Sequence, residues 1–401
     1  MLILTASSGL YAENISLNAL IQKAKDKNPE IIAARNNWNA EKVRVLPERT
    51  WESPGFFIDS QNMPVDEFNL GKANETMYGI EQMVPFPGKL AIKGKIAALD
   101  AERAMWDFRE TEFKVIAQLK AAYSKYFYIN KAIDIYNDNL ELMKNFAAVA
   151  ETKYISGKTS QGEVLRAQVE TSKMYNMIIT LQQEKELAEA ELNALIGNDP
   201  DEKIQIPEEL TLSYIKKGWD EIRNIIINNN PQLKKENIGI LTGRWLNRYA
   251  KTGFLPDFDL TYRKRRMSGS WSGQDLMVGF TLPLWFWKPA FNIKESAYGL
   301  KASLAGQKNM ELMTVYAGKE LFIKLQTLER QLELYKTTFL PQAEQAFKVI
   351  EVSYRSGKED FLMLLDSERA LLDFQIDYYK SFSEYYQNLA ELERISGVEL
   401  K

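Results

Sequence analysis

The chain repeats itself after about 200 residues, and this duplication limits its fold more than any other feature. Segment 154–158 (YISGK) matches segment 354–358 (YRSGK), an offset of 354 − 154 = 200. An internal repeat predicts that one structural unit is built twice. Residues 13–197 are therefore predicted as the first unit, 198–218 as a linker and 219–401 as the second. Three shorter matches keep the same order: 195–197 with 395–397, 28–30 with 230–232, and 84–86 with 282–284.

Each unit is predicted to consist of long helices around a pair of strands. Apolar residues recur every seven positions in the longest helical segments, as in coiled coils, and each Ser-Gly turn predicts an antiparallel helical hairpin. The interruption at Asn28-Pro29 is expected near the start of the first helix. The predicted helices span 15–48, 89–154, 159–196, 219–251, 290–354 and 359–395, and the predicted strands span 55–62, 76–84, 257–266 and 275–284.

Alternation in the second strand pair leaves two interpretations open. Phe258, Leu260 and Tyr262 alternate with polar neighbours, as in a transmembrane barrel strand, but a half-buried soluble hairpin shows the same pattern. The aromatic run Trp285, Phe286 and Trp287 follows. It fits either a girdle at a membrane interface or a packed corner between strand and helix.

The number of strands bears on how such a chain could cross a membrane. Four strands cannot close into a barrel, and open sheet edges are not tolerated in lipid. Two chains would supply eight strands, which leave no lumen, whereas three would supply twelve and an open lumen. A trimer of a duplicated unit would also form a pseudo-sixfold ring.

Composition excludes several classes of function. The chain has no His and no Cys, which removes Ser-His and Cys-His catalysis, the usual zinc sites and disulfides. We find no Gly-rich phosphate loop and no paired-carboxylate motif, so no catalytic residue, cofactor or metal is predicted. The net charge of −3 argues against nucleic acid as a partner.

The first 12 residues are apolar and small. They are interpreted as a shortened secretory signal, although a disordered tail is the alternative. No run elsewhere reaches the roughly 18 apolar residues that a membrane-spanning helix needs.

Taken together, these features resemble the TolC-type outer-membrane efflux channels over nearly all of residues 15–397. The resemblance is carried by the duplicated order of elements, by Pro-Phe-Pro-Gly-Lys at 85–89, by the Tyr-x-x-Gly turns at Gly157 and Gly357, and by Leu-Leu-Asp at 364–366. It implies a homotrimer with a twelve-stranded barrel in the outer membrane of a Gram-negative bacterium and a helical α-barrel in the periplasm. The implied function is a passive duct for solutes delivered by an inner-membrane pump and a periplasmic adaptor.

The resemblance also implies roles for residues near the two turns. The family has rings of Asp just past the second turn. Asp366 matches one of these positions, Met363 occupies the other, and Glu163 stands at the comparable place after the first turn. Such carboxylates would form rings that attract cations, or they are solvated groups favoured by the helix dipole. The expected adaptor contacts at the hairpin tips are Gly157, Lys158, Gly357, Lys358, Glu359 and Asp360.

Other classes of protein remain as alternatives. A periplasmic adaptor also carries a helical hairpin, but usually one hairpin among many strands, so the repeat counts against it. A coiled-coil structural protein or a soluble enzyme on a helical scaffold would lack a pore. The sequence predicts neither the exported compound nor the class of pump.

Overall fold

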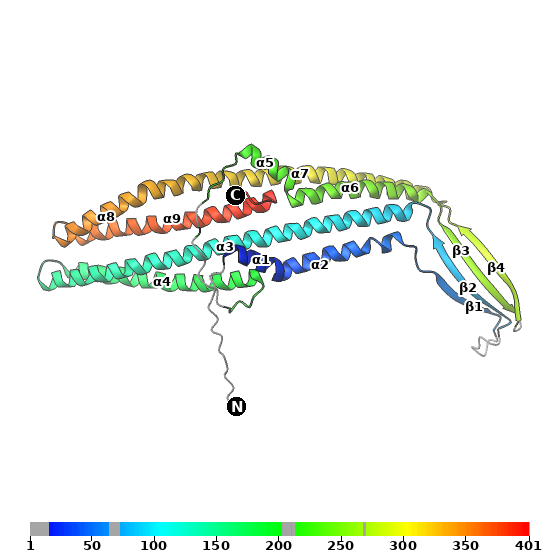
Figure 1. Cartoon of the computed structure of the whole chain (residues 1–401), viewed down its shortest axis with the longest axis horizontal. Coiled ribbons are helices and arrows are strands. Elements are labelled where there is room, and N and C mark those ends of the chain that lie inside the picture. The colour runs from blue at the N-terminus through cyan, green and yellow to red at the C-terminus, as the bar shows by residue number, and fades with distance from the viewer. Residues whose placement is uncertain (1–15, 64–72, 203–209, 211–212, 268–269, 401) are drawn as a thin grey trace, which may run out of the picture. The chain divides into compact units, whose positions relative to one another are not determined.

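The structure, a computed structural model, describes residues 16–63, 73–202, 210, 213–267 and 270–400. The predicted signal segment 1–12 lies outside these residues. The first repeat contains α1 (Leu17–Lys27), α2 (Pro29–Arg44), η1 (Pro47–Arg49), β1 (Gly55–Gln61), β2 (Glu75–Val84), α3 (Lys89–Ile155) and α4 (Gln161–Ile196) (Figure 1). The second contains α5 (Trp219–Asn229), α6 (Pro231–Lys251), η3 (Thr252–Phe254), β3 (Phe258–Met267), β4 (Ser270–Phe280), α7 (Trp287–Leu334), η4 (Tyr335–Phe339), α8 (Leu340–Arg355) and α9 (Phe361–Ser396). This order confirms the predicted fold class.

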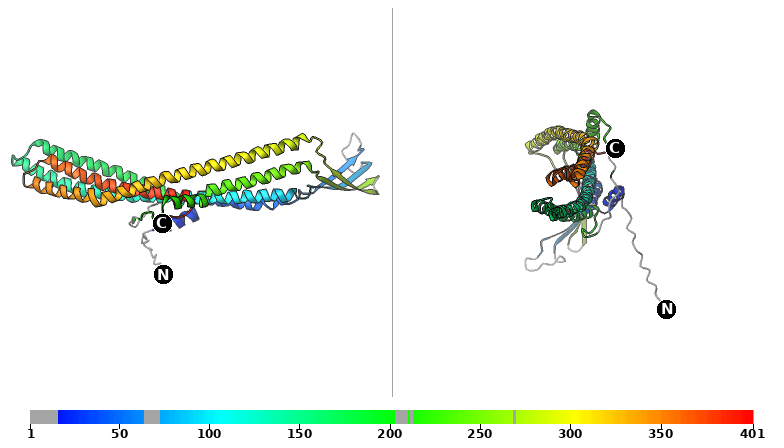
Figure 2. Two further views of the ribbon diagram at one scale, coloured as in Figure 1. Left: turned by 90° about the horizontal axis from the view of Figure 1, so that it is seen from above. Right: turned by 90° about the vertical axis from the view of Figure 1, so that its left-hand side faces the viewer.

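The chain forms two compact units, and both repeats contribute to each. Unit 1 consists of Met1–Ala33, Arg109–Asn230 and Met313–Lys401, and it contains the helical hairpins. Unit 2 consists of Ala34–Phe108 and Pro231–Leu312, and it contains the sheet. In unit 1, the C-terminal part of α3 runs beside α4, and α8 runs beside α9, so that both hairpin turns lie at one end (Figure 2).

The matched Asn-Pro pairs have the same structural role in both repeats. The Asn28 side chain donates a 2.9 Å hydrogen bond to the carbonyl oxygen of Leu195, and Asn230 donates a 2.7 Å bond to that of Ile395. Each therefore ties the start of its repeat to the last turn of the returning helix. The second pair also divides the predicted helix 219–251 into α5 and α6, because proline suits the first position of a new helix.

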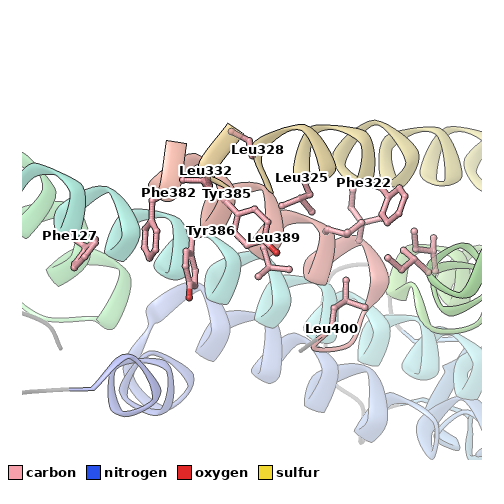
Figure 3. Close-up of a cluster of buried hydrophobic side chains, with 14 residues drawn as sticks. Phe127, Phe322, Leu325, Leu328, Leu332, Phe382, Tyr385, Tyr386, Leu389 and Leu400 are labelled. Atoms are coloured by element: carbon pink, nitrogen blue, oxygen red, sulfur yellow. The ribbon is translucent and has the colours of Figure 1, made fainter. Parts of the chain in front are cut away.

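The largest hydrophobic cluster of unit 1 lies where α7 and α9 pack against α3 (Figure 3). Phe382 of α9 packs on Phe127 of α3 with ring centroids 5.6 Å apart. Burying side chains of this size stabilises the fold by about 1.5–3 kcal/mol each. The cluster consists of Phe127, Ile222, Ile226, Phe322, Leu325, Leu328, Leu332, Phe382, Tyr385, Tyr386, Leu389, Leu392, Ile395 and Leu400.

A π-helical segment, η4, corrects the predicted seam of the second hairpin. The seven-residue spacing of Leu325, Leu332 and Phe339 predicts that Ala346 continues the seam, but Ala346 is exposed and Ala343 is buried instead. The Leu340 N–H donates to the carbonyl oxygen of Tyr335, five residues earlier, so one extra residue enters the turn. Pro341 follows and has no N–H to donate, which favours an irregular turn at this point.

The four strands form one antiparallel sheet in the order β1-β2-β3-β4. Strand β4 differs from the prediction at both ends. It begins at Ser270, so Trp271 lies in the strand and not in the predicted loop, because a bulge between Arg265 and Arg266 lets β3 pair further. It ends at Phe280, opposite Phe258, three residues before Pro283.

The Pro-Phe-Pro-Gly-Lys segment joins the sheet to the helices of unit 2. The Lys89 ammonium lies 2.8 and 2.9 Å from the two carboxylate oxygens of Asp257, just before β3. The backbone N–H of Phe86 donates to the same carboxylate at 2.8 Å. Asp257 therefore links the end of the first strand pair to the start of the second.

We predict that Gly197→Ala destabilises the protein more than Gly157→Ala. Both glycines have left-handed backbone angles, with φ of 75° and 70°, so each substitution costs about 1–2 kcal/mol in backbone strain. An added Cβ at Gly197 would lie 2.6 Å from the carbonyl oxygen of Lys27, whereas the space at Gly157 is open. Thermal unfolding of both variants measures the difference, and equal midpoints would contradict the packing around Gly197.

Candidate functional site

The two hairpin turns have the same geometry. Each closes through a glycine with positive φ, Gly157 at 70° and Gly357 at 77°. The N–H of the following lysine then donates to a carbonyl five residues earlier, at 2.8 Å for Lys158 and 2.9 Å for Lys358. Both glycines and both lysines are exposed. The predicted adaptor contacts therefore lie on the surface of two matched turns.

The acidic residues of the second turn differ in their local roles. Asp360 caps α9, because its carboxylate accepts a 2.9 Å hydrogen bond from the Met363 N–H. The Glu359 side chain is exposed. Glu359 is therefore available to a partner, whereas Asp360 also has a structural task.

The two hairpins are joined at their tips by Lys153 of α3. Its ammonium donates a 2.6 Å hydrogen bond to the carbonyl oxygen of Tyr354 in α8, and it lies 3.6 Å from the centroid of the Tyr354 ring. Burial lowers the pKa of Lys153, with a further lowering from Lys158, while Glu163 opposes the shift. Tyr354 is itself only 1% exposed. Burial, with a contribution from Glu163, raises its pKa to about 12.

The predicted gate residues lie in different environments. Glu163 is half-buried, and its charge acts on both Lys153 and Tyr354. The Asp366 side chain is 58% exposed, 4.0 Å from the Arg369 guanidinium. Met363 is 51% exposed. The structure therefore places Glu163 at the contact between hairpins and Asp366 on an open face of α9.

A second polar contact between the hairpins escaped sequence reasoning. Arg369 of α9 donates to the Glu170 carboxylate of α4, which also accepts a 2.9 Å bond from Lys173. Although burial opposes ionisation of Glu170, these hydrogen bonds hold its pKa below the usual value. The sequence does carry a signal for this contact. Glu170 and Arg369 have opposite charges and occupy nearly equivalent positions in the two repeats, since 369 − 170 = 199. We call Lys153, Glu163, Glu170, Tyr354 and Arg369 the hairpin junction.

Glu368 is a buried acid next to this junction. It is 1% exposed, and neither carboxylate oxygen has a hydrogen-bond partner among the described residues. Burial raises its pKa to about 7, Arg369 acts against the shift, and Glu170 and Asp373 add to it. A single acidic residue in an apolar seam gave no recognisable motif, so sequence reasoning missed it.

We predict that Glu368 makes stability depend on pH. The unfolded chain releases this proton near the ordinary value of about 4.5, whereas the folded chain keeps it up to about 7. The contribution of Glu368 to stability should therefore be greatest below pH 4.5 and fall by about 3 kcal/mol as the pH rises to 7. Glu368→Gln should remove this contribution, so that its unfolding midpoint falls less between pH 5 and 8 than that of the wild type. The exposed control Asp366→Asn should keep it, and an unchanged pH profile in Glu368→Gln would refute the assignment.

The sheet of unit 2 has one apolar face and one polar face, as the alternation predicted. The apolar face includes Phe56, Ile80, Tyr262 and Leu276, which are adjacent in register across the four strands. The predicted girdle does not follow β4 directly, since residues 281–284 lie between the end of the strand at Phe280 and Trp285, and Trp287 begins α7. Its rings contact one another, with Trp287 5.2 Å from Trp285 and 5.3 Å from Phe286, and all three side chains are exposed.

Among the described residues, no group of three or more acidic side chains is arranged to hold a metal ion. Among the helices described, none combines the length and apolar character needed to cross a membrane.

The duplicated hairpins and two-faced sheet define a class of channel-forming proteins, and comparison with known proteins identifies the family. The model of the outer membrane efflux protein family matches residues 20–198 and 223–398. The chain belongs to this family. It is an outer-membrane channel component of an efflux system, with a large periplasmic helical portion.

Individual relatives are distant in sequence but similar along their whole length. The chain is 20% identical over 406 residues to the cobalt-zinc-cadmium resistance protein CzcC of Cupriavidus metallidurans, covering 99% of this chain and 90% of CzcC. The chain also matches the solved structure of CusC, a protein that forms a transmembrane channel. The TM-score is 0.83 at 14% identity, and the match covers 98% of this chain and 95% of CusC. The outer membrane protein VceC of Vibrio cholerae matches with a TM-score of 0.81 at 16% identity, covering 96% and 97%.

Proposed function

We propose that three copies of this chain form a passive duct whose periplasmic end opens and closes at the hairpin junction. The observation that carries this proposal is the pair of polar contacts between the hairpins, Lys153 with Tyr354 and Glu170 with Arg369. Polar contacts near a surface contribute about 1 kcal/mol or less each, so a docking partner can replace them. No catalytic step is required, because the energy for transport comes from the pump.

The trimer is supported by the sheet and by the resemblance to known channels. Within the described residues, β1 and β4 each pair on one side only. Their free edges need further strands before the sheet can enter lipid. Three chains supply twelve strands, which enclose an open lumen.

The partners of the periplasmic end are proposed to be an adaptor and an inner-membrane pump. Gly157, Lys158, Gly357, Lys358 and Glu359 present an exposed surface at the two turns. The surface carries both charge signs and lies beside Lys153 and Tyr354. Binding of an adaptor there would therefore act directly on the contacts that hold the hairpins together.

The substrate is proposed to pass without being coordinated by the duct. CzcC is named for resistance to cobalt, zinc and cadmium, but this chain has neither His nor Cys with which to bind such ions. The carboxylates of Asp366 and Glu163, repeated in three copies, would favour cations over anions. Choice among cationic solutes would then rest with the pump.

We predict that Lys153→Met and Arg369→Met raise the conductance of the protein in planar bilayers. Each change removes one polar contact between the hairpins, which lowers the free energy of opening by about 1 kcal/mol and raises the open fraction about fivefold. The double variant should exceed either single one.

Lys324→Met is the matched control. Lys324 is exposed on α7 and forms its ion pair with Glu320 of the same helix, at 2.6 Å. Its loss should leave conductance unchanged. Equal conductance in wild type, Lys153→Met and Arg369→Met would show that these contacts do not hold the gate.

We predict that Asp366→Asn lowers cation selectivity, because it removes three charges from the proposed constriction. Reversal potentials in a salt gradient measure this change. Glu359→Gln removes a carboxylate at the turn and should leave the reversal potential unaltered. If both variants behave alike, Asp366 does not line the narrowest part of the duct.

A further inference from the structure

A cavity of about 610 Å³ lies among the helices of unit 2, lined by residues of α3, α6, η3 and α7. Its size falls within the range of about 300–1,000 Å³ that is usual for sites of small molecules. Much of its wall is made of small residues, which leave the space between α6 and α7 open. These are Gly239, Gly243, Ser296, Gly299 and Ser303.

The hydroxyl of Thr242 is an unsatisfied polar group on the wall of this cavity. Thr242 lines the cavity and is only 8% exposed, and its Oγ1 has no hydrogen-bond partner among the described residues. A buried polar group without a partner costs stability. Because a hydroxyl oxygen can accept from an amine, the site offers an unused acceptor for an N–H group.

Two carboxylates on the same wall also lack a cation from the chain. Within the described residues, the side chains of Glu236 on α6 and Glu295 on α7 form no ion pair and no hydrogen bond. Of the basic residues that line the cavity, Lys89 is neutralised by Asp257 at 2.8 Å. Arg103 is exposed on α3. The wall therefore carries two unpaired carboxylates against one guanidinium.

Two contacts fix the register of α6 against α7. The Asn247 side chain donates a 2.9 Å hydrogen bond to the hydroxyl of Ser296. An added Cβ at Gly243 would lie 3.3 Å from the side chain of Leu300. Both pairs give the same antiparallel register, because a step of four residues along α6 matches a step of four residues back along α7.

This register separates the two carboxylates along the cavity. Glu295 lies level with residue 248 of α6, and 248 − 236 = 12, so Glu236 lies 12 residues away along the helix axis. At 1.5 Å per residue, the separation is about 18 Å. One unpaired carboxylate therefore stands near each end of the cavity, with the glycines between them.

We infer that this cavity binds a linear organic diamine, with one ammonium group at Glu236 and the other at Glu295. The methylene chain would lie over the glycines and against Leu246 and Leu300, which also line the cavity. An N–H of the ligand would satisfy the hydroxyl of Thr242. The inference concerns unit 2 alone. It depends neither on the gate proposed at the hairpin junction nor on whether such a diamine is exported.

The test measures binding of 1,12-diaminododecane and 1,4-diaminobutane to the full chain in detergent by isothermal titration calorimetry, with a titration into detergent alone subtracted. The extended long diamine can reach both carboxylates, whereas the short one cannot, so wild type should bind the long diamine more tightly. Glu236→Gln and Glu295→Gln should each weaken its binding by up to about fivefold. Each should also narrow the difference between the two probes. Equal affinity of wild type for both diamines, or an unchanged difference in both variants, would overturn the inference.

Two further variants separate the site from general surface charge. Glu102 is exposed on α3 beside Arg103 but does not line the cavity, so Glu102→Gln should bind the long diamine as wild type does. Arg103→Gln removes a like charge from the wall and should strengthen binding. A loss in Glu102→Gln equal to that in Glu236→Gln would count against a defined site.

Gly239→Leu tests the cavity itself. An added Cβ at Gly239 meets no atom within 4 Å, so the leucine side chain can occupy the open space and should prevent binding of the long diamine. Gly306→Leu is the matched control, since Gly306 on α7 has equally open surroundings and does not line the cavity. Thermal unfolding checks that both variants fold. Wild-type binding in a folded Gly239→Leu variant would contradict the proposed site.

Discussion

The unpaired edges of the sheet are the constraint on which the rest of the molecule depends. Within the described residues, β1 and β4 each present one edge without a partner strand, and β2 and β3 join the two repeats in the middle. Backbone groups along such edges cannot be satisfied in lipid. A single chain therefore cannot satisfy the edges of its own sheet in a membrane. Because the duplicated chain supplies two strand pairs, it needs half as many copies to complete the sheet as a chain with one strand pair would.

The helical hairpins of unit 1 meet a related requirement at their tips. The hairpin tips combine a buried aromatic group, in which Tyr354 lies 5.8 Å from Phe361 and 6.5 Å from Phe146, with a few polar contacts. The aromatic packing gives each tip a defined shape, while the polar contacts connect one hairpin to the next. Glu368, further along α9, is buried and has no hydrogen-bond partner for its carboxylate among the described residues. Ionising it therefore costs stability that an apolar side chain at this position would not cost.

Much of the fold could be predicted because it depends on local signals that occur twice. The Ser-Gly turns, the Asn-Pro pairs and the alternation of Phe258, Leu260 and Tyr262 each specify backbone geometry within a few residues. Predictions failed where geometry depends on distant partners. Trp271 joined β4 because β3 was available to pair with it, and Ala346 left the seam because η4 added a residue.

The candidate site was predictable in part for the same reason. Repeat matching located the turns, and the resemblance to the efflux channels pointed to the carboxylates beyond them. Glu163 was found beside Lys153 and Tyr354. Arg369 and Glu170 come from different hairpins, and only the packed structure brings them together. The burial of Glu368 likewise depends on three-dimensional packing, which seven-residue spacing does not specify.

The π segment η4 also makes the two hairpins mechanically unequal. Helix α3 runs from Lys89 to Ile155 as continuous α-helix, whereas its counterpart is divided at residues 335–339, just before Pro341. Missing and lengthened backbone hydrogen bonds lower the bending stiffness of a helix at one point. A sideways force on the tips is therefore expected to bend the second hairpin first. The bend would lie at the stacked rings of Phe339 and Phe374, whose centroids are 5.0 Å apart. The two repeats of the chain therefore contain one stiffer helical hairpin and one more flexible helical hairpin.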